Sequence, residues 1–228
     1  MNTTPQLLQS HPVFENLPEN TLEQIASISV QRSYTENDVI VHIGDVWPIL
    51  FLVLDGCVNV IKESAMGRTL IATTLETSDL FWGLAFFQPN TPMPVLLEAV
   101  TDSELIRWNS KELGPYIRAH GEVSWKLCEL MVSRMQMASE IVEDLAFQPV
   151  MGRLAGLLLQ DFSDTRNRAV ARDLTLEEMA GRIGSTKEMV CRYLYKFAEI
   201  GAIEINRTAI KIADRDYLLQ KSGKNLSS

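Results

Sequence analysis

The stretch Thr175-Leu-Glu-Glu-Met-Ala-Gly-Arg-Ile-Gly184 predicts a short helix that ends at a glycine. Its first residue is a threonine with Glu178 three positions later, which is the spacing of a helix-capping box. Gly184 can adopt the left-handed conformation that ends many helices. Ser185-Thr186 then offers an N-cap for a second helix from Lys187 to Phe197. Two short helices joined through a glycine are typical of a helix-turn-helix.

The second of these helices has an apolar side and a polar side. Ala180 is small enough to let the two helices cross closely, and Val190 can fill the space between them. The polar side consists of Lys187, Glu188, Cys191, Arg192 and Lys196. Lysine and arginine can donate to guanine O6 and N7, glutamate can accept from cytosine N4, and Thr186 can hold a phosphate at the helix start. The pattern predicts readout of DNA by this helix, with a merely solvated charged face as the alternative.

The residues on either side extend this domain. Pro149 suits the first turn of a preceding helix, and a polar, basic connector is expected over residues 161–173. After the helix pair, the runs 202–205 and 209–212 flank Asn206-Arg-Thr208, which predicts a β-hairpin wing. Arg207 at the tip of the hairpin could touch a DNA backbone.

Charge is divided unevenly along the chain. Of 228 residues, 21 are Lys or Arg and 29 are Asp or Glu, which gives a formal net charge of -8. Residues 148–228 hold 13 of the basic and 10 of the acidic residues, a net of +3, and residues 1–147 have a net of -11. An acidic body joined to a basic end is expected when only that end approaches a nucleic acid.

From Ser110 to about Leu145 the apolar period lengthens to about three and a half residues, which predicts a long helix. Its stripe consists of Leu127, Met131, Arg134, Ala138, Ile141 and Leu145, widened by Met135 and Val142. Leu130 and Met137 lie on a second flank. One flank can pack on the helix's own domain and the other on a copy of itself, so we expect a homodimer helix. An intramolecular core helix is the alternative, and Arg134 at the seam must snorkel or pair.

Between Ser29 and about Trp108, short β-rich runs alternate with turn signals. The runs are 39–43, 49–54, 58–61, 70–75, 95–100 and 104–108, with turns at Gly44-Asp45, Asp55-Gly56 and Met66-Gly67. Strands this closely spaced, with no helices between them, predict an antiparallel sandwich or barrel of the jelly-roll type. Residues 12–28 predict a short helix ahead of it, capped near Pro18.

These features together resemble the CRP/FNR family of bacterial transcription regulators. The resemblance covers nearly the whole chain and is strongest at Gly184-Ser-Thr-Lys-Glu-Met-Val-Cys-Arg192, which is similar to the family's recognition-helix signature. It implies an α+β chain in three parts. These are an antiparallel β-roll (a double-stranded β-helix or jelly roll) at 1–109, a dimerisation helix at 110–147 and a winged helix-turn-helix at 148–228.

The resemblance also implies contacts and partners. Lys187, Glu188 and Arg192 would read bases and Thr186 would contact phosphate, with Lys196 and Arg207 as further DNA contacts. Lysine at position 187, where many members have arginine, lacks the bidentate fork of a guanidinium. The implied partners are a second copy of the chain, a pseudo-palindromic double-stranded DNA site with half-sites about one helical turn apart, and RNA polymerase.

The segment from Asp79 to Pro94 departs from the cyclic-nucleotide-binding members of the family. Those members use a glutamate for the ribose and an Arg-Ser pair for the cyclic phosphate, where this chain has Gly83 and Met93-Pro94. A buried phosphate would lack its cation and hydroxyl, so cyclic AMP is not expected as the effector. The aromatic side chains of this segment suit an apolar or planar ligand. The alternative is that they form an ordinary hydrophobic core. The candidate effector pocket consists of Phe81, Trp82, Gly83, Met93, Ala138 and Ser139.

Other cofactors have little support in the sequence. Cys57, Cys128 and Cys191 are far apart and none precedes position 57, so neither an iron-sulfur cluster nor a disulfide framework is expected. The histidines are scattered as well, which predicts no metal site. His42 or His120 could ligate a haem, but no other feature supports this. The sequence therefore leaves the effector unknown.

The remaining predictions concern location and class. No apolar run reaches the roughly 18 residues of a membrane span, and no signal peptide is recognisable, so a cytoplasmic protein without a membrane partner is expected. A nucleophile elbow, P-loop or dinucleotide fingerprint is missing from the sequence, so an enzyme with catalytic residues is not expected. The alternative function is a ligand-binding or protein-interaction module whose winged helix does not read DNA sequence.

Overall fold

The computed structural model describes residues 4–162, 170–171, 174–206 and 208–223. The chain divides into two compact units. The first comprises Met1–Lys62 and Thr73–Met137, and the second comprises Glu63–Ala72 and Ala138–Ser228. Within the described ranges, no helix is long and apolar enough to cross a membrane.

The first unit begins with two short helices, α1 (Thr4–Ser10) and α2 (Glu19–Ser27). Helix α2 confirms the predicted helix in this region, and its residues Leu22 and Ile25 are buried. The predicted cap is wrong in detail, because Pro18 occupies the N-cap position and its ring has no oxygen to accept a hydrogen bond. Helix α1 was not predicted.

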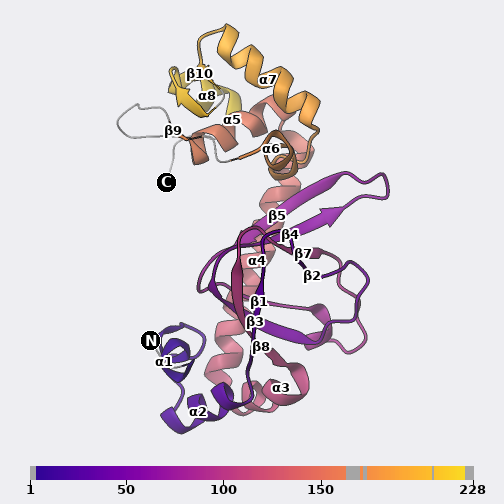
Figure 1. Ribbon diagram of the computed structural model, residues 1–228, viewed down its shortest axis with the longest axis vertical. Helices are drawn as coiled ribbons and strands as arrows, with labels where there is room; N and C mark the ends of the chain where they lie inside the picture. Colours follow the sequence, from indigo (N-terminus) through magenta and orange to yellow (C-terminus); the bar gives the residue numbers. More distant parts are fainter. Residues whose placement is uncertain (1–3, 163–169, 172–173, 207, 224–228) are drawn as a thin grey trace. The chain divides into compact units, whose positions relative to one another are not determined.

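Among the described residues, eight strands form two antiparallel four-stranded sheets (Figure 1). One sheet has the order β1 (Val30–Tyr34), β8 (Ser103–Asn109), β3 (Ile49–Asp55) and β6 (Leu80–Trp82). The other has the order β2 (Val39–Val41), β7 (Leu96–Ala99), β4 (Val58–Glu63) and β5 (Thr69–Leu75). A 3-10 turn, η1 (Leu84–Phe86), follows β6. The predicted β-roll is confirmed, and β1 and β6 are the strands that the sequence did not indicate.

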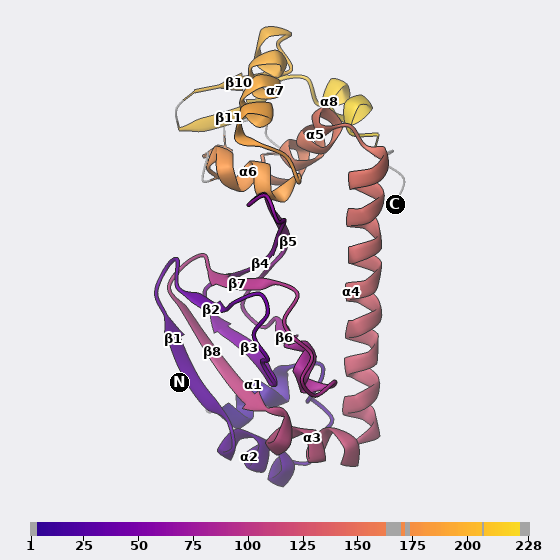
Figure 2. The same cartoon turned by 90° about the vertical axis from the view of Figure 1, so that its right-hand side faces the viewer.

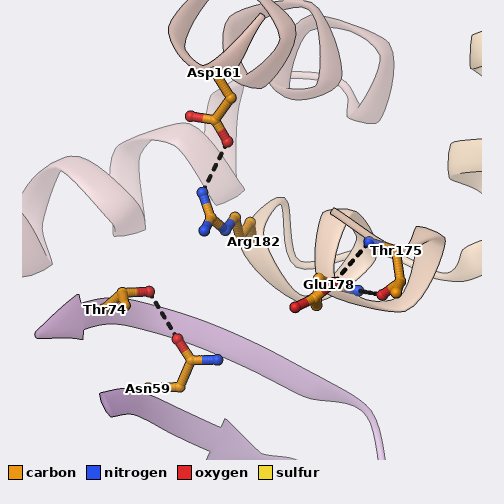
Figure 3. A network of polar contacts seen from close by, with 6 residues as sticks. All are labelled: Asn59, Thr74, Asp161, Thr175, Glu178 and Arg182. Carbon is orange, nitrogen blue, oxygen red and sulfur yellow. Dashed lines mark hydrogen bonds and ion pairs between the residues drawn. The ribbon is translucent and has the colours of Figure 1, made fainter. Parts of the chain in front are cut away.

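Strand β3 carries residues of two different cores. Phe51 and Val53 lie in a cluster between the sheets, and Leu50 and Leu52 lie in a cluster with the helices. Successive residues of a strand point to opposite faces, so a strand covered on both sides is apolar throughout. Trp108 fixes the outer cluster to α2, since its indole N–H donates to the carbonyl of Ile25 at 2.8 Å. A partly buried polar pair also joins β4 to β5, where the Thr74 hydroxyl donates to Asn59 Oδ1 at 2.7 Å (Figure 3).

The helix predicted from Ser110 onward is two helices, α3 (Ser110–Ala119) and α4 (Gly121–Phe147). Asn109 caps α3, because its side chain accepts from the N–H of Lys111 at 3.0 Å. His120 then has an extended backbone, with φ -117° and ψ 97°, and this residue separates the two helices. Helix α4 itself runs unbroken for 27 residues (Figure 2).

The second unit contains four further helices and a small sheet. The helices are α5 (Val150–Asp161), α6 (Leu176–Arg182), α7 (Lys187–Glu199) and α8 (Arg215–Ser222). The sheet has the antiparallel order β10 (Ile203–Ile205), β11 (Ala209–Ile212) and β9 (Val170–Ala171). The predicted wing is therefore confirmed as β10 and β11. Strand β9 falls in the stretch predicted as a connector, whose remaining residues 163–169 and 172–173 lie outside the described residues.

Candidate nucleic-acid interface

Helix α6 begins with the predicted capping box (Figure 3). The Thr175 hydroxyl accepts from the N–H of Glu178 at 3.1 Å, and the Glu178 carboxylate accepts from the N–H of Thr175 at 2.6 Å. Two backbone donors that a helix start leaves unpaired are thereby satisfied. The first turn of α6 is fixed at the residue where the sequence placed it.

The turn between α6 and α7 depends on Gly184. Its φ is +58°, in the left-handed region that favours glycine. A Cβ at this position would also lie 2.7 Å from Cδ2 of Leu145, so a side chain there would have to displace Leu145. The N–H of Ser185 donates to the carbonyl of Ala180 at 2.9 Å and closes the end of α6. Ala180 and Val190 are buried between the helices, as predicted.

Helix α7 exposes the side chains predicted to contact DNA. Thr186 is its N-cap, with its hydroxyl accepting from the N–H of Met189 at 3.4 Å. The exposed residues of the predicted polar face are Lys187, Glu188, Arg192 and Lys196, and Cys191 is half-buried among them. Tyr195 is 70% exposed on the same helix, three residues after Arg192, and was not predicted as a contact. The i, i+3 spacing is the sequence signal that could have indicated it.

An acidic residue of α6 pairs with the first basic residue of α7. The Lys187 ammonium donates to the carboxylate of Glu177, and both side chains are more than half exposed. This hydrogen bond raises the pKa of Lys187 and lowers the pKa of Glu177. The pKa of Glu188 is also lowered, first by a hydrogen bond from the backbone and then by one from Thr186. Both carboxylates are therefore ionised at neutral pH, and the sequence analysis did not single out Glu177.

The tip of the wing is ordered by an asparagine. Asn206 Oδ1 accepts from the N–H groups of Thr208 at 2.9 Å and of Ala209 at 2.8 Å. Glu204 and Lys211 face each other across the two strands and form an ion pair at 2.9 Å. Arg207, predicted to contact a DNA backbone, lies outside the described residues.

The predicted interface stripe on α4 is not one exposed surface. Leu127 is 2% exposed and packs in the core of the first unit, so this prediction is corrected: Leu127 has no free surface to give a second copy. Arg134 is largely buried and pairs with Asp79 at 3.6 Å, and in the described structure its buried Nε has no hydrogen-bond partner. Met131 and Ile141 are half-buried, Ala138 is exposed, and Leu145 covers the Gly184 turn.

A different stripe of α4 is exposed and apolar. It contains Trp125, Val132, Met135 and Val142, with exposed fractions from 50% to 67%. Cys128 and Ser139, which are also exposed, complete alternating steps of three and four residues. The sequence analysis included Met135 and Val142 only as the margin of its stripe. The two stripes are offset by one residue, a rotation of about 100° about the helix axis, and the core of the first unit covers Leu127 on the predicted stripe.

The candidate effector residues are divided between the two units. Ala138 and Ser139 are exposed on α4 in the second unit. In the first unit, Met93 is buried in the inner cluster of the β-roll, and Phe81 packs against that cluster. Phe81 also stacks on Trp82, with ring centroids 6.0 Å apart and an interplanar angle of 24°. Met93 and Phe81 therefore belong to the cluster between the sheets, whereas Trp82 packs against the cluster that contains the helices.

Gly83 lies where no side chain fits. A Cβ at this position would be 2.0 Å from the carbonyl oxygen of Trp47, and the N–H of Gly83 donates to the carbonyl of Ile49 at 2.9 Å. Its φ of -76° is ordinary, so the requirement for glycine is one of space alone. A glutamate at this position would need the backbone of Trp47 to move.

The histidines and cysteines are not gathered into a site. Among the described residues, no three or more His, Cys, Asp and Glu side chains are grouped so as to hold a metal ion. His42 is exposed and His120 is half-buried, and a role for either as a haem ligand is untested. His11 is buried, and burial lowers its pKa. Cys57 is half-buried, and burial raises the pKa of its thiol.

Comparison with known families gives two matches along the chain. Residues 31–120 match the cyclic nucleotide-binding domain, and residues 152–221 match the Crp-like helix-turn-helix domain. Together these matches cover more than half of the chain.

Curated relatives and solved structures agree with these matches. The chain is 24% identical to the CRP-like cAMP-activated global transcriptional regulator of Mycobacterium tuberculosis, over 95% of this chain and 99% of that protein. It is 26% identical to the cAMP-activated global transcriptional regulator Vfr of Pseudomonas aeruginosa, over 81% of this chain and 89% of that protein.

Among solved structures, a putative regulator of the crp/fnr family from Eubacterium rectale has a TM-score of 0.77 at 22% identity, covering 93% of this chain and 98% of that one. The c-di-GMP responsive regulator CLP of Xanthomonas campestris has a TM-score of 0.76 at 19% identity, covering 86% of this chain and 99% of that one. These structures show the same fold. The chain belongs to the CRP/FNR family and is a DNA-binding transcription regulator of that type.

Proposed function

We propose that this regulator is a homodimer that reads a pseudo-palindromic DNA site with two copies of α7. The observation that carries the proposal is the exposed polar face of α7 above a fully buried Val190. The buried side fixes the helix in its domain, and the exposed side leaves the base-reading groups accessible. A recognition helix in the major groove needs both properties.

Each predicted contact has a chemical role. The Arg192 guanidinium can donate two hydrogen bonds to guanine, and the Glu188 carboxylate can accept one from cytosine N4. Lys187 can donate as a point charge, and Thr186 can contact phosphate at the helix start. Lys196 and Arg207 would add contacts to the DNA backbone.

The exposed stripe of α4 supports the dimer. A single helix leaves Trp125, Val132, Met135 and Val142 in contact with water, and pairing with a second copy of this stripe would bury them. Two-fold pairing is the commonest arrangement of homo-oligomers, and it matches the symmetry of a palindromic site. The proposed interface is therefore this stripe rather than the one that contains Leu127.

We further propose that the input differs from that of the cAMP-activated relatives. A nucleotide would meet Gly83 and Met93 where a carboxylate and a cation are required. The effector would then be a ligand other than cyclic AMP, or none, and neither an iron-sulfur cluster nor a haem is proposed. Phe81 and Trp82 would suit a planar molecule. RNA polymerase as a partner and a cytoplasmic location complete the proposal.

The test is selection of bound sequences from random DNA by the full-length chain. We expect a two-fold-symmetric site whose half-sites are about one helical turn apart. Arg192→Ala should weaken binding to the selected site by about 1–3 kcal/mol and relax the choice at one base pair. Binding to random DNA should change little, and Lys126→Ala, at a half-buried site in the first unit where Lys126 pairs with Glu129, serves as the control.

Two results would contradict the proposal. Equal loss of affinity for selected and random DNA in the Arg192→Ala variant would remove that residue's role in base readout. Recovery of no sequence, with DNA binding absent or insensitive to salt, would favour a ligand-binding or protein-interaction module. Repeating the selection with candidate ligands, while following Trp82 fluorescence, would test the input.

A further inference from the structure

Arg153, in the first turn of α5, donates hydrogen bonds to four backbone carbonyls. Its Nε donates to Ile183 at 2.7 Å. Its Nη1 donates to Gln148 at 2.6 Å and to Asp144 at 3.4 Å, and its Nη2 donates to Gly184 at 3.4 Å. One guanidinium therefore connects two segments that are more than thirty residues apart in the sequence.

The four carbonyls lie at the ends of two helices. Asp144 belongs to the last turn of α4, and Gln148 follows that helix directly. Ile183 is the C-cap of α6, and Gly184 is the turn residue that leads into α7. The last carbonyls of a helix carry the negative end of the helix dipole. A cation between two such ends is stabilised by both.

Arginine is the residue type that this position requires. Its planar guanidinium presents five N–H donors in a fixed fork, whereas lysine has three donors on a single nitrogen. Arg153 is half-buried, and burial lowers its pKa, although a guanidinium stays charged at any physiological pH. Its ordered geometry holds the charge against carbonyl oxygens rather than in water.

The residues around Arg153 restrict its movement. A Cβ at the preceding Gly152 would lie 2.7 Å from the carbonyl oxygen of Lys221, so α5 packs closely on α8. Leu145 of α4 covers the Gly184 turn at a distance that excludes a Cβ there. A cavity of about 120 Å³ lies beside the guanidinium and is lined in part by Ile141, Leu157 and Arg182. Arg153 thus connects these segments through hydrogen bonds beside the cavity.

We infer that Arg153 is a positioning residue, which holds the α6–α7 turn at a fixed orientation to the C-terminal end of α4. The inference rests on the proposed function. If α4 pairs two copies of the chain, the orientation of each α7 to its own α4 decides whether both recognition helices meet half-sites of one spacing. Arg153 would then contribute to the recognition of two half-sites together, without itself contacting a base.

The experiment compares full-site and half-site DNA. The full-length chain and its variants Arg153→Met and Arg153→Lys are titrated against the selected palindrome, a single half-site, and palindromes with altered spacing. Arg182→Met is the matched control, because Arg182 is in the same unit but pairs with a carboxylate, Asp161, at 2.8 Å (Figure 3). Circular dichroism melting establishes that each variant is folded at the titration temperature.

We expect Arg153→Met to reduce the ratio of full-site to half-site affinity about tenfold and to weaken the preference for one spacing. Arg153→Lys should give a smaller reduction, and Arg182→Met should leave the ratio unchanged. If Arg153→Met does not fold, Arg153→Lys carries the same test. The inference is wrong if the folded Arg153 variants keep the ratio of full-site to half-site affinity of the unaltered chain. This includes the case in which the two affinities fall by the same factor. If the unaltered chain binds neither DNA, the proposed function fails instead.

Discussion

Helix α7 and the segment from β6 to Met93 use their side chains in opposite ways. On α7, Lys187, Glu188 and Arg192 are exposed on a helix fixed by a buried Val190. In the β-roll segment, Met93 is buried and Gly83 lies against the backbone of Trp47. Helix α7 exposes charged side chains to solvent, whereas the β-roll segment is closely packed at Gly83 and Met93.

This difference reflects what DNA binding and ligand binding each require of a regulator. DNA readout requires accessible donors and acceptors. The outer face of a recognition helix therefore stays in solvent and contributes little to the packing of its domain. A ligand site requires space and polar partners inside a domain, and both are reduced at Gly83 and Met93. The chain matches its named relatives in the DNA-binding domain, and our proposal is that it differs from them in the ligand that the β-roll accepts.

The largest expected effect comes from placing a charge on the buried side of α7. Val190→Asp places an unpaired carboxylate in the core of the second unit, where Val190 is fully buried. We expect a loss of about 4 kcal/mol in the free energy of unfolding of that unit, together with loss of DNA binding. Urea unfolding measures the first quantity. Glu188→Ala, on the exposed side of the same helix, is the control and should lose far less stability, since it removes only the hydrogen bonds that lower the pKa of Glu188.

The next effect concerns the exposed face of α4. Met135→Glu places a charge in the proposed dimer interface, where Met135 is 66% exposed in one copy of the chain. We expect the dimer dissociation constant to rise at least about 100-fold, as measured by light scattering over a concentration series. Glu140→Gln, at an exposed position on another side of α4, is the control. A dimer of unchanged affinity in Met135→Glu would place the interface elsewhere.

A smaller effect tests whether the β-roll segment has space for a side chain at Gly83. Gly83→Ala adds a Cβ 2.0 Å from the carbonyl oxygen of Trp47, so the strand or the loop must shift. We expect a loss of about 1–3 kcal/mol in stability, as for other overpacked sites. Gly121→Ala is the control, since nothing lies within 4 Å of a Cβ there. If Gly83→Ala melts at the same temperature as the unaltered chain, the segment has more room than its contacts indicate.

Local signals predicted the helix-turn-helix well. The Thr175 and Glu178 spacing, Gly184 and Thr186 each act through atoms only a few residues away, and each lies where the sequence placed it. The wing followed from two alternating runs and a turn, although its third strand, β9, pairs with β11 from about forty residues away. Pairing at that separation leaves no mark on local periodicity.

The residues that the sequence misassigned depend on distant parts of the chain. Leu127 is a core residue because the β-roll covers it, and Arg134 is partly neutralised by Asp79, which lies more than fifty residues earlier. The role of Arg153 could not be predicted, because its four acceptors are backbone carbonyls of any residue type. The sequence indicated Gly83 as a departure from the nucleotide-binding members, but the carbonyl of Trp47 that requires a glycine there is visible only in the fold.

The smallest expected effect concerns the ion pair at the exposed face of α7. Glu177 holds the Lys187 ammonium on the surface of α7, and it also places a negative charge near any bound phosphate. In Glu177→Gln the lysine is free to contact DNA, so we expect affinity for both selected and random DNA to rise about two- to fivefold at low salt. Glu199→Gln, near the far end of α7, is the control and should raise affinity less.

The same variant has a signed effect on acid stability. Because the pKa of Glu177 is lowered in the folded chain, the Glu177 carboxylate stabilises the fold above its ordinary pKa. This contribution is lost as the pH falls through the lowered value. Glu177→Gln should therefore be slightly less stable than the unaltered chain at neutral pH, and the difference should vanish in acid. Melting temperatures measured across that range would show it, and a difference that grows on acidification would mean that Lys187 and Glu177 are not paired in solution.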